Sequence, residues 1–209
     1  MLAVFTHSFA AVFAMMNPFG NLPVFMTLTS SHTLQEQRNI AKRSVLIAFV
    51  IMTVFLLLGH YILSFFGITI NAFRIAGGIL IFGIANQLLQ AKTGHSQSLH
   101  ENETLESKGK DDVSVTPLAT PILAGPGTIA TIMALSVGNP PVVVFPAEFV
   151  AYTLVLVIIY LVFRYSHLIS KHLGTTELNV ITRLMGLILA IIAVQMAVTG
   201  IKNLFPVLQ

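Results

Sequence analysis

The sequence predicts an all-α, polytopic membrane protein with six transmembrane spans, built as two inverted three-span repeats whose spans 1 and 4 are broken at Pro and Gly residues. Hydrophobic residues form 55% of the 209-residue chain and charged residues only 9%, which is more apolar surface than a soluble core of this size can bury. Six apolar runs are long enough to cross about 30 Å of hydrocarbon, which takes about 20 helical residues. These runs cover residues 2–29, 44–66, 71–91, 117–137, 145–165 and 180–205.

Prolines in two of the apolar runs reveal an internal duplication. Pro18 and Pro23 lie five residues apart in the first run, and Pro121 and Pro126 repeat that spacing 103 residues later in the fourth. Duplication with a Pro/Gly break in corresponding hydrophobic segments is typical of membrane transporters built from repeats, whose site lies at the two breaks.

The third and sixth runs repeat a second pattern. The segment Arg74–Leu80 is matched by Arg183–Leu189, and each arginine is followed twelve residues later by an amide, Asn86 or Gln195. The Gly and Arg residues predict close helix packing and interfacial anchoring, respectively. The two amides are secondary candidates for a site, although hydrogen bonds between helices would also explain them.

The chain divides into a first three-span repeat at residues 1–91, a linker at 92–116 and a second repeat at 117–209. The linker holds five acidic and three basic residues, so it predicts a flexible cytoplasmic connection. His95 and His100 within it lack the paired spacing of a metal site.

Two local patterns predict helix starts. Thr33 and Glu36 have the spacing of a capping box, so a helix is expected to begin near Leu34. Pro146 and Glu148 also fit the first turn of a helix, where the dipole favours an acidic side chain. With Glu148 at a helix start, no Asp or Glu is expected at mid-membrane.

The distribution of positive charge predicts the orientation. Nine of the eleven Lys and Arg residues fall on the side of the loops after spans one, three and five. They are Arg38, Lys42, Arg43, Lys92, Lys108, Lys110, Arg164, Lys171 and Arg183. The positive-inside rule therefore places loops 30–43, 92–116 and 166–179 in the cytoplasm of a bacterial cell and both termini in the periplasm. Because each repeat has three spans, the second must enter from the opposite side and is inverted.

The two breaks predict a binding site for a zwitterion. Unwound backbone at membrane depth is tolerated only inside protein or beside an aqueous cavity. The half-helix after each break begins with free N–H groups that can bind a carboxylate, and the half-helix before it ends in carbonyls that suit an ammonium group. The candidate substrate-binding residues are Asn17, Pro18, Gly20, Asn21, Pro121, Gly125, Gly127 and Thr128. The alternative is that the prolines only kink two helices and that the polar side chains only cap them.

Several classes of function are not expected. The sequence has no H-E-x-x-H, G-x-S-x-G or P-loop motif and no paired carboxylates within a span, so we expect no enzyme and no catalytic residues. It has no cysteine, and we expect no metal site. The basic residues flank spans, which argues against nucleic acid as a partner. His7 and His60 are isolated in sequence and are given no role.

Four motifs together resemble the MarC family of small integral membrane proteins, close to its YchE-like branch. They lie at Asn17–Phe25, at Phe66–Ile68 with Phe73–Ile79, at Pro117–Pro121 with Ala124–Gly127, and at Asn179–Leu189. The resemblance implies a six-span inner-membrane protein. It also implies a function, because some similar proteins transport small neutral amino acids such as alanine and glycine.

The function expected from these observations is secondary transport of small neutral amino acids by alternating access at the interface of two inverted repeats. A proton or a sodium ion is the candidate coupling ion. The partners are the lipid bilayer and a small zwitterionic substrate, and a second copy of the chain is a further candidate. The alternatives are a passive channel for a small neutral solute and a membrane scaffold that transports nothing.

Overall fold

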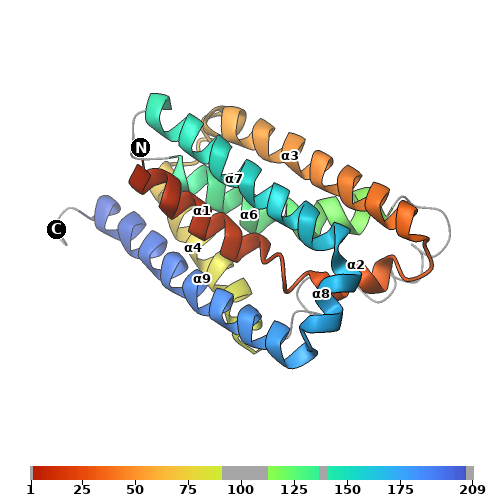
Figure 1. Cartoon of the computed structure of the whole chain (residues 1–209). Helices are drawn as coiled ribbons and strands as arrows, with labels where there is room; N and C mark the ends of the chain where they lie inside the picture. Colours follow the sequence, from red (N-terminus) through yellow and green to blue (C-terminus); the bar gives the residue numbers. More distant parts are fainter. Residues whose placement is uncertain (1, 91–112, 137–140, 206–209) are drawn as a thin grey trace.

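The computed structural model describes residues 2–90, 113–136 and 141–205, and this part of the chain is helical apart from short connections, with no strand. The prediction of an all-α protein is confirmed. The elements are α1 (Leu2–Met16), α2 (Leu22–Leu28), α3 (Leu34–Phe65), α4 (Ile70–Leu89), η2 (Ser114–Leu123), α6 (Pro126–Leu135), α7 (Pro141–Arg164), α8 (Ser166–His172) and α9 (Thr175–Leu204) (Figure 1). Helix η2 begins within the segment 92–116 that was predicted to be linker.

Four helices are long and apolar enough to cross a membrane: α3, α4, α7 and α9. Two shorter apolar helices, α1 and α6, have 15 and 10 residues. Each of these two lies beside a break, since α1 is followed by α2 and α6 is preceded by η2. The breaks therefore occur in the two apolar runs in which the paired prolines predict them.

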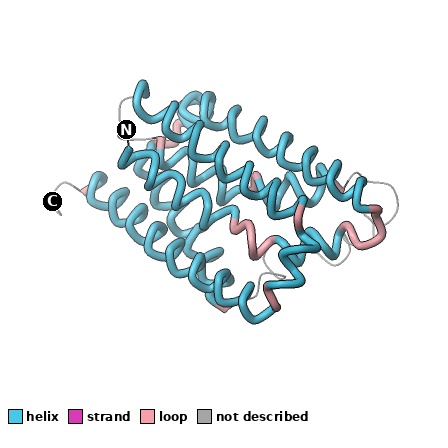
Figure 2. The backbone as a smooth tube through the Cα atoms, in the orientation of Figure 1, coloured by secondary structure: helices cyan, strands magenta, loops and turns pink. Residues whose placement is uncertain are grey.

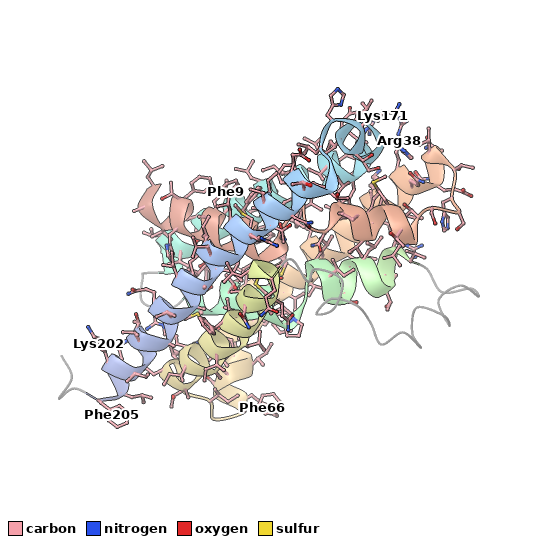
Figure 3. All side chains as sticks on the ribbon, turned by 90° about the horizontal axis from the view of Figure 1, so that it is seen from below. Phe9, Arg38, Phe66, Lys171, Lys202 and Phe205 are labelled. Atoms are coloured by element: carbon pink, nitrogen blue, oxygen red, sulfur yellow. The ribbon has the colours of Figure 1, made fainter. Side chains whose placement is uncertain are left out.

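The helices lie along a common direction, and both termini are at one end of the bundle (Figure 1). We call this the terminal end; Lys202 and Phe205 mark it in Figure 3. Arg38 and Lys171 lie at the opposite end, which we call the basic end (Figure 3). Helices α2 and α8, the start of α3 and helix η2 are found there, and α6 runs from η2 back toward the terminal end (Figure 1).

Helices α4 and α9 form the most extensive helix pair among the described elements. They run antiparallel, because Gly78 lies against Ala193 and Ala197 while Gly186 lies against Ala85 and its neighbours. A Cβ atom at Gly78 would stand 2.8 Å from the carbonyl oxygen of Ala193, and one at Gly186 would stand 3.0 Å from that of Ala85. The two backbones are therefore so close that only glycine fits at these crossings.

The start of α3 is where the sequence predicts it. The Thr33 hydroxyl accepts a hydrogen bond from the Glu36 N–H at 3.3 Å, and the Glu36 carboxylate accepts one from the Thr33 N–H at 2.7 Å. This reciprocal pair is the capping box. The segments 30–43 and 166–179, predicted as loops, are largely helical, because α3 begins at Leu34 and because α8 and the start of α9 together fill most of the second segment.

The predicted start of the fifth span is wrong. Helix α7 begins at Pro141, so Pro146 and Glu148 lie inside the helix instead of in its first turn. Both prolines suit a first turn, and the apolar residues between them continue the helix surface, so the sequence offered two equivalent starts. Glu148 is therefore a residue of the helix interior, and its side chain is buried.

Two glycines of α4 give a direct test of the α4–α9 contact. Gly78→Ala should lower stability by roughly 1–3 kcal/mol, because the new methyl group meets the backbone of α9. Gly83 has no atom within 4 Å of its Cβ position, so Gly83→Ala should leave stability unchanged or raise it by up to about 1 kcal/mol through helix propensity. Thermal unfolding of the detergent-purified variants measures both. Equal melting temperatures for the two variants would show that the helices are not in backbone contact.

Candidate functional site

The first break begins where α1 ends at Met16, and it lies between the two ends of the bundle (Figure 2). Asn17 adopts a positive φ of 40°, a backbone conformation that asparagine tolerates better than most residues. Its N–H still donates to the Phe13 carbonyl at 2.9 Å, and its own carbonyl accepts from the Asn21 N–H at 3.1 Å. The chain therefore turns at Asn17 while most backbone groups of the turn keep partners.

The amide side chain of Asn17 folds over Gly20. Its Oδ1 accepts a hydrogen bond from the Gly20 N–H at 3.2 Å, and a Cβ at Gly20 would overlap the amide group. Gly20 is therefore the residue that makes room for the amide. The Nδ2 of Asn17 is buried and has no hydrogen-bond partner within the described part of the chain. An unpartnered buried donor is energetically unfavourable, and a ligand acceptor would relieve that cost.

Asn21 has a different part in the same break. Its Nδ2 donates to the carbonyl of Met16 at 2.7 Å, so it caps the last turn of α1. It precedes α2 as the N-cap residue but makes no side-chain bond to that helix. Of the two asparagines, Asn21 therefore stabilises the broken helix and Asn17 holds the available donor. Pro18 and Gly20, the other predicted residues of this break, are both buried.

The second break is produced by prolines that force the residues before them out of helical geometry. Thr116 and Thr120 each precede a proline, and both are extended, with φ/ψ of −127°/123° and −131°/129°. Helix η2 bridges these distortions with bonds five residues apart, from the Leu118 N–H to Val113 at 3.4 Å and from the Ala124 N–H to Ala119 at 2.8 Å. Pro121 lies within η2.

Helix α6 opens with free backbone donors. Gly125 is extended, with φ −83° and ψ 172°, and Pro126 follows as the first helical residue. The first bond of the helix runs from the Ile129 N–H to the Gly125 carbonyl at 3.0 Å. The N–H groups of Gly127 and Thr128 precede it and have no acceptor within the helix. Both residues are buried, so this is a positive helix end inside the protein.

The two breaks lie against each other. A Cβ at Gly127 would overlap the Met15 side chain from the end of α1 and would stand 2.7 Å from Ile84 of α4. Helix α1 also packs directly on α6. Gly127 of the second break therefore lies against Met15, two residues before Asn17 of the first, although the first prolines of the two breaks are 103 residues apart.

The secondary candidates, Asn86 and Gln195, are not brought together. Gln195 lies between the two α9 residues that flank Gly78, and Asn86 is eight residues further along α4. At 1.5 Å per residue this separates them by about 12 Å along the helix pair. Asn86 is exposed and its Oδ1 accepts from the Gln90 side chain at 3.3 Å.

A cavity of about 350 Å³ lies between α1, α4, α6 and α9, in the half of the bundle toward the terminal end. Its polar lining residues are His7, Ser8, Arg74, Thr131, Gln195 and Thr199, from α1, α4, α6 and α9. The Thr131 hydroxyl donates to the carbonyl of Gly127 at 2.8 Å, which places the cavity wall one helical turn from the second break. Within the described chain, the buried Ser8 hydroxyl has no hydrogen-bond partner.

A second cavity, of about 370 Å³, lies between α3, α6 and the start of α7. His60 and Ser136 line it, and the Ser136 hydroxyl is 2.7 Å from Oε2 of Glu148. Glu148 is 1% exposed. Glu148 is therefore the eighth residue of a helix that is long and apolar enough to cross a membrane, instead of a residue at its start. The signal was present, because Glu148 has apolar residues on both sides within one long run.

Comparisons with known proteins agree with this architecture. The family description "MarC family integral membrane protein" matches residues 2–205. The chain is 51% identical to the UPF0056 membrane protein YvbG of Bacillus subtilis over 208 residues, covering 100% of this chain and 99% of that protein. It is 38% identical to a UPF0056 membrane protein of Methanocaldococcus jannaschii (97% and 98% covered) and 36% identical to YhcE of Escherichia coli (97% and 94% covered). No solved structure matches. The chain therefore belongs to the MarC family of integral membrane proteins.

Proposed function

We propose that this protein is a secondary transporter of small neutral amino acids in the bacterial inner membrane. The observation that carries the proposal is the contact of α1 with α6 beside two breaks whose donors have no partner among the described residues: the buried Nδ2 of Asn17 and the N–H groups of Gly127 and Thr128. The free N–H groups of a helix N-terminus favour a carboxylate without requiring a basic side chain, and the amide of Asn17 would add a further donor.

The substrate class follows from the chemistry and the space of the breaks. A carboxylate would bind the donors of Asn17, Gly127 and Thr128, and an ammonium group would bind carbonyls at the end of η2. Met15 and Ile84 close in on Gly127, so a large side chain on the substrate would not fit. These features together favour alanine, glycine and amino acids of similar size.

The transport mechanism is alternating access between two inverted halves. In this arrangement α1 with α2, α3 and α4 form one half, and η2 with α6, α7 and α9 form the other, giving six passes. The broken helix of one half packs on the first long helix of the other, as α1 does on α7 and η2 does on α3. The cavity toward the terminal end would supply access from that side to the second break.

Transport is tested by uptake of radiolabelled amino acids into proteoliposomes, with imposed gradients of protons or sodium ions. Saturable uptake of alanine or glycine, with counterflow when the vesicles are preloaded, supports a carrier. Swelling of the vesicles in any small neutral solute, without saturation, would instead indicate a channel. An inert protein that inserts normally would indicate a scaffold.

Asn17→Gly tests the site itself. Glycine accepts the positive φ of this position, so the backbone keeps its turn while the amide donor is removed. A hydrogen bond to a charged group contributes about 1.5–3 kcal/mol, so the apparent affinity for the substrate should fall roughly 10- to 150-fold. The control is Asn86→Ala, which removes an exposed amide of α4 and should leave affinity unchanged. A loss of affinity in Asn86→Ala but not in Asn17→Gly would show that the site lies in the α4–α9 pair.

The orientation is tested with single cysteines, since the chain has none of its own. Lys171 and Lys202 are exposed at opposite ends of the bundle (Figure 3). With the termini in the periplasm, a membrane-impermeant maleimide should label Lys202→Cys in intact cells and Lys171→Cys only after permeabilisation. Labelling of both positions in intact cells would contradict a membrane crossing between them. Labelling of Lys171→Cys alone would show that the termini are in the cytoplasm.

A further inference from the structure

We propose that Glu148 is a proton-binding site of this protein and that its proton is the ion coupled to transport. The site consists of the Glu148 carboxyl group on α7, the Ser136 hydroxyl at the end of α6 and the cavity that Ser136 lines. The coupling rests on the proposed transport function. The binding of a proton by Glu148 does not, and it can be tested without any substrate.

Glu148 lies within an apolar helix that is long enough to span a membrane. It is the eighth residue of α7, so it is about 10 Å from the first residue of that helix at 1.5 Å per residue. Its side chain is buried, and its Oε1 has no hydrogen-bond partner among the described residues. An ionised carboxylate with one oxygen buried and unpartnered is strongly disfavoured in such surroundings, whereas the neutral acid is tolerated.

The geometry around Ser136 also favours the protonated acid. The Ser136 Oγ is 2.7 Å from Oε2 of Glu148 and 2.9 Å from the carbonyl oxygen of Ile132. A hydroxyl group has a single proton to donate. If Glu148 were ionised, both neighbours would be acceptors and one of the two contacts would lack a hydrogen. If Glu148 carries a proton, it donates to Ser136 and Ser136 donates to Ile132, so both bonds form.

Among the described residues, no cation forms an ion pair with Glu148. His60 on α3 borders the cavity that Ser136 lines, and Tyr61 follows it. Tyr152, one turn further along α7, has its hydroxyl 2.7 Å from that of Thr53. On α1 the titratable group is His7, which lines the other cavity. The remaining charged or titratable residues of α3, α7 and α8 belong to the part of each helix toward the basic end: Glu36, Arg38, Lys42, Arg43, Tyr160, Arg164, His167, Lys171 and His172.

A release path is present beside the site. On deprotonation, the proton of the Glu148 carboxyl group passes through the Ser136 hydroxyl to water in the cavity of about 370 Å³, and the carboxylate keeps the electron pair. The new charge would lie near the C-terminal end of α6, where the helix dipole is also negative. Ionisation therefore favours movement of this helix end away from Glu148 or entry of water between them.

Helix α6 links the proton to the substrate. Ser136 is the C-cap residue of α6, and the free N–H groups of Gly127 and Thr128 are at the start of the same helix. The helix has ten residues and is about 15 Å long. A proton on Glu148 and a carboxylate at the second break would therefore act on the two ends of one short helix, which gives each of them influence over the other's affinity.

The protonation state is tested first, by infrared difference spectroscopy of the purified protein at neutral pH. The wild type minus Glu148→Gln spectrum should contain the carbonyl stretch of a protonated carboxylic acid. Ser136→Ala should retain this band but shift its frequency, because the hydrogen-bond partner is lost. The control variant Glu177→Gln changes an exposed glutamate of α9, and its spectrum should keep the carbonyl band of the protonated acid. A carboxylate band in place of the acid band would overturn the proposal.

The coupling is tested in proteoliposomes with alanine or glycine. Glutamine has the size of the protonated acid but cannot release a proton, so Glu148→Gln should still exchange internal for external substrate while losing accumulation driven by a pH gradient. Glu177→Gln should retain both activities. Accumulation by Glu148→Gln equal to that of the wild type would overturn the coupling role. If the wild type moved no amino acid, the proposed function would fail while the infrared result on Glu148 would stand.

Discussion

Every backbone N–H and C=O group inside a bilayer needs a partner within the protein, because hydrocarbon offers none. The long helices α3, α4, α7 and α9 meet this demand through their own hydrogen bonds. The two breaks cannot, since their prolines remove donors and prevent regular turns. The chain closes the first break with turn bonds and the amide of Asn21. It closes the second with bonds five residues apart. The donors that still lack a partner among the described residues are the groups that a ligand could bind.

The same proline spacing therefore produces two breaks of different chemistry. At the first, the backbone is largely satisfied and the available donor is a side chain, the amide of Asn17. At the second, the available donors belong to the backbone at the start of α6. Met15, two residues before Asn17, contacts Gly127 at the start of α6, so residues beside the two breaks touch. Under the proposed function, the two breaks would contribute different donors to one site.

Local patterns in the sequence predicted the features that depend on neighbouring residues. The capping box at Thr33 and the two proline breaks are of this kind, because the atoms involved are within a few residues of one another. The start of α7 was not predictable, since Pro141 and Pro146 fit a helix start equally well. The different roles of Asn17 and Asn21 at the first break follow from the positive φ angle of Asn17. The burial of Glu148 follows from the position of α6. Both depend on tertiary structure that no short pattern records.

The contacts of the helices indicate which of them could move in the proposed transport cycle. Helices α4 and α9 meet backbone to backbone at Gly78 and Gly186, so sliding one past the other would bring main-chain atoms into collision. Helix α6 instead meets α1 through the Met15 side chain and α3 through Met133, which lies over Gly59. Methionine side chains are unbranched and adapt to new positions at low cost. Helix α6 also packs on α4, where Ala130 lies near Gly77. If the protein transports as proposed, α6 is the element whose position a proton at one end and a substrate at the other would set.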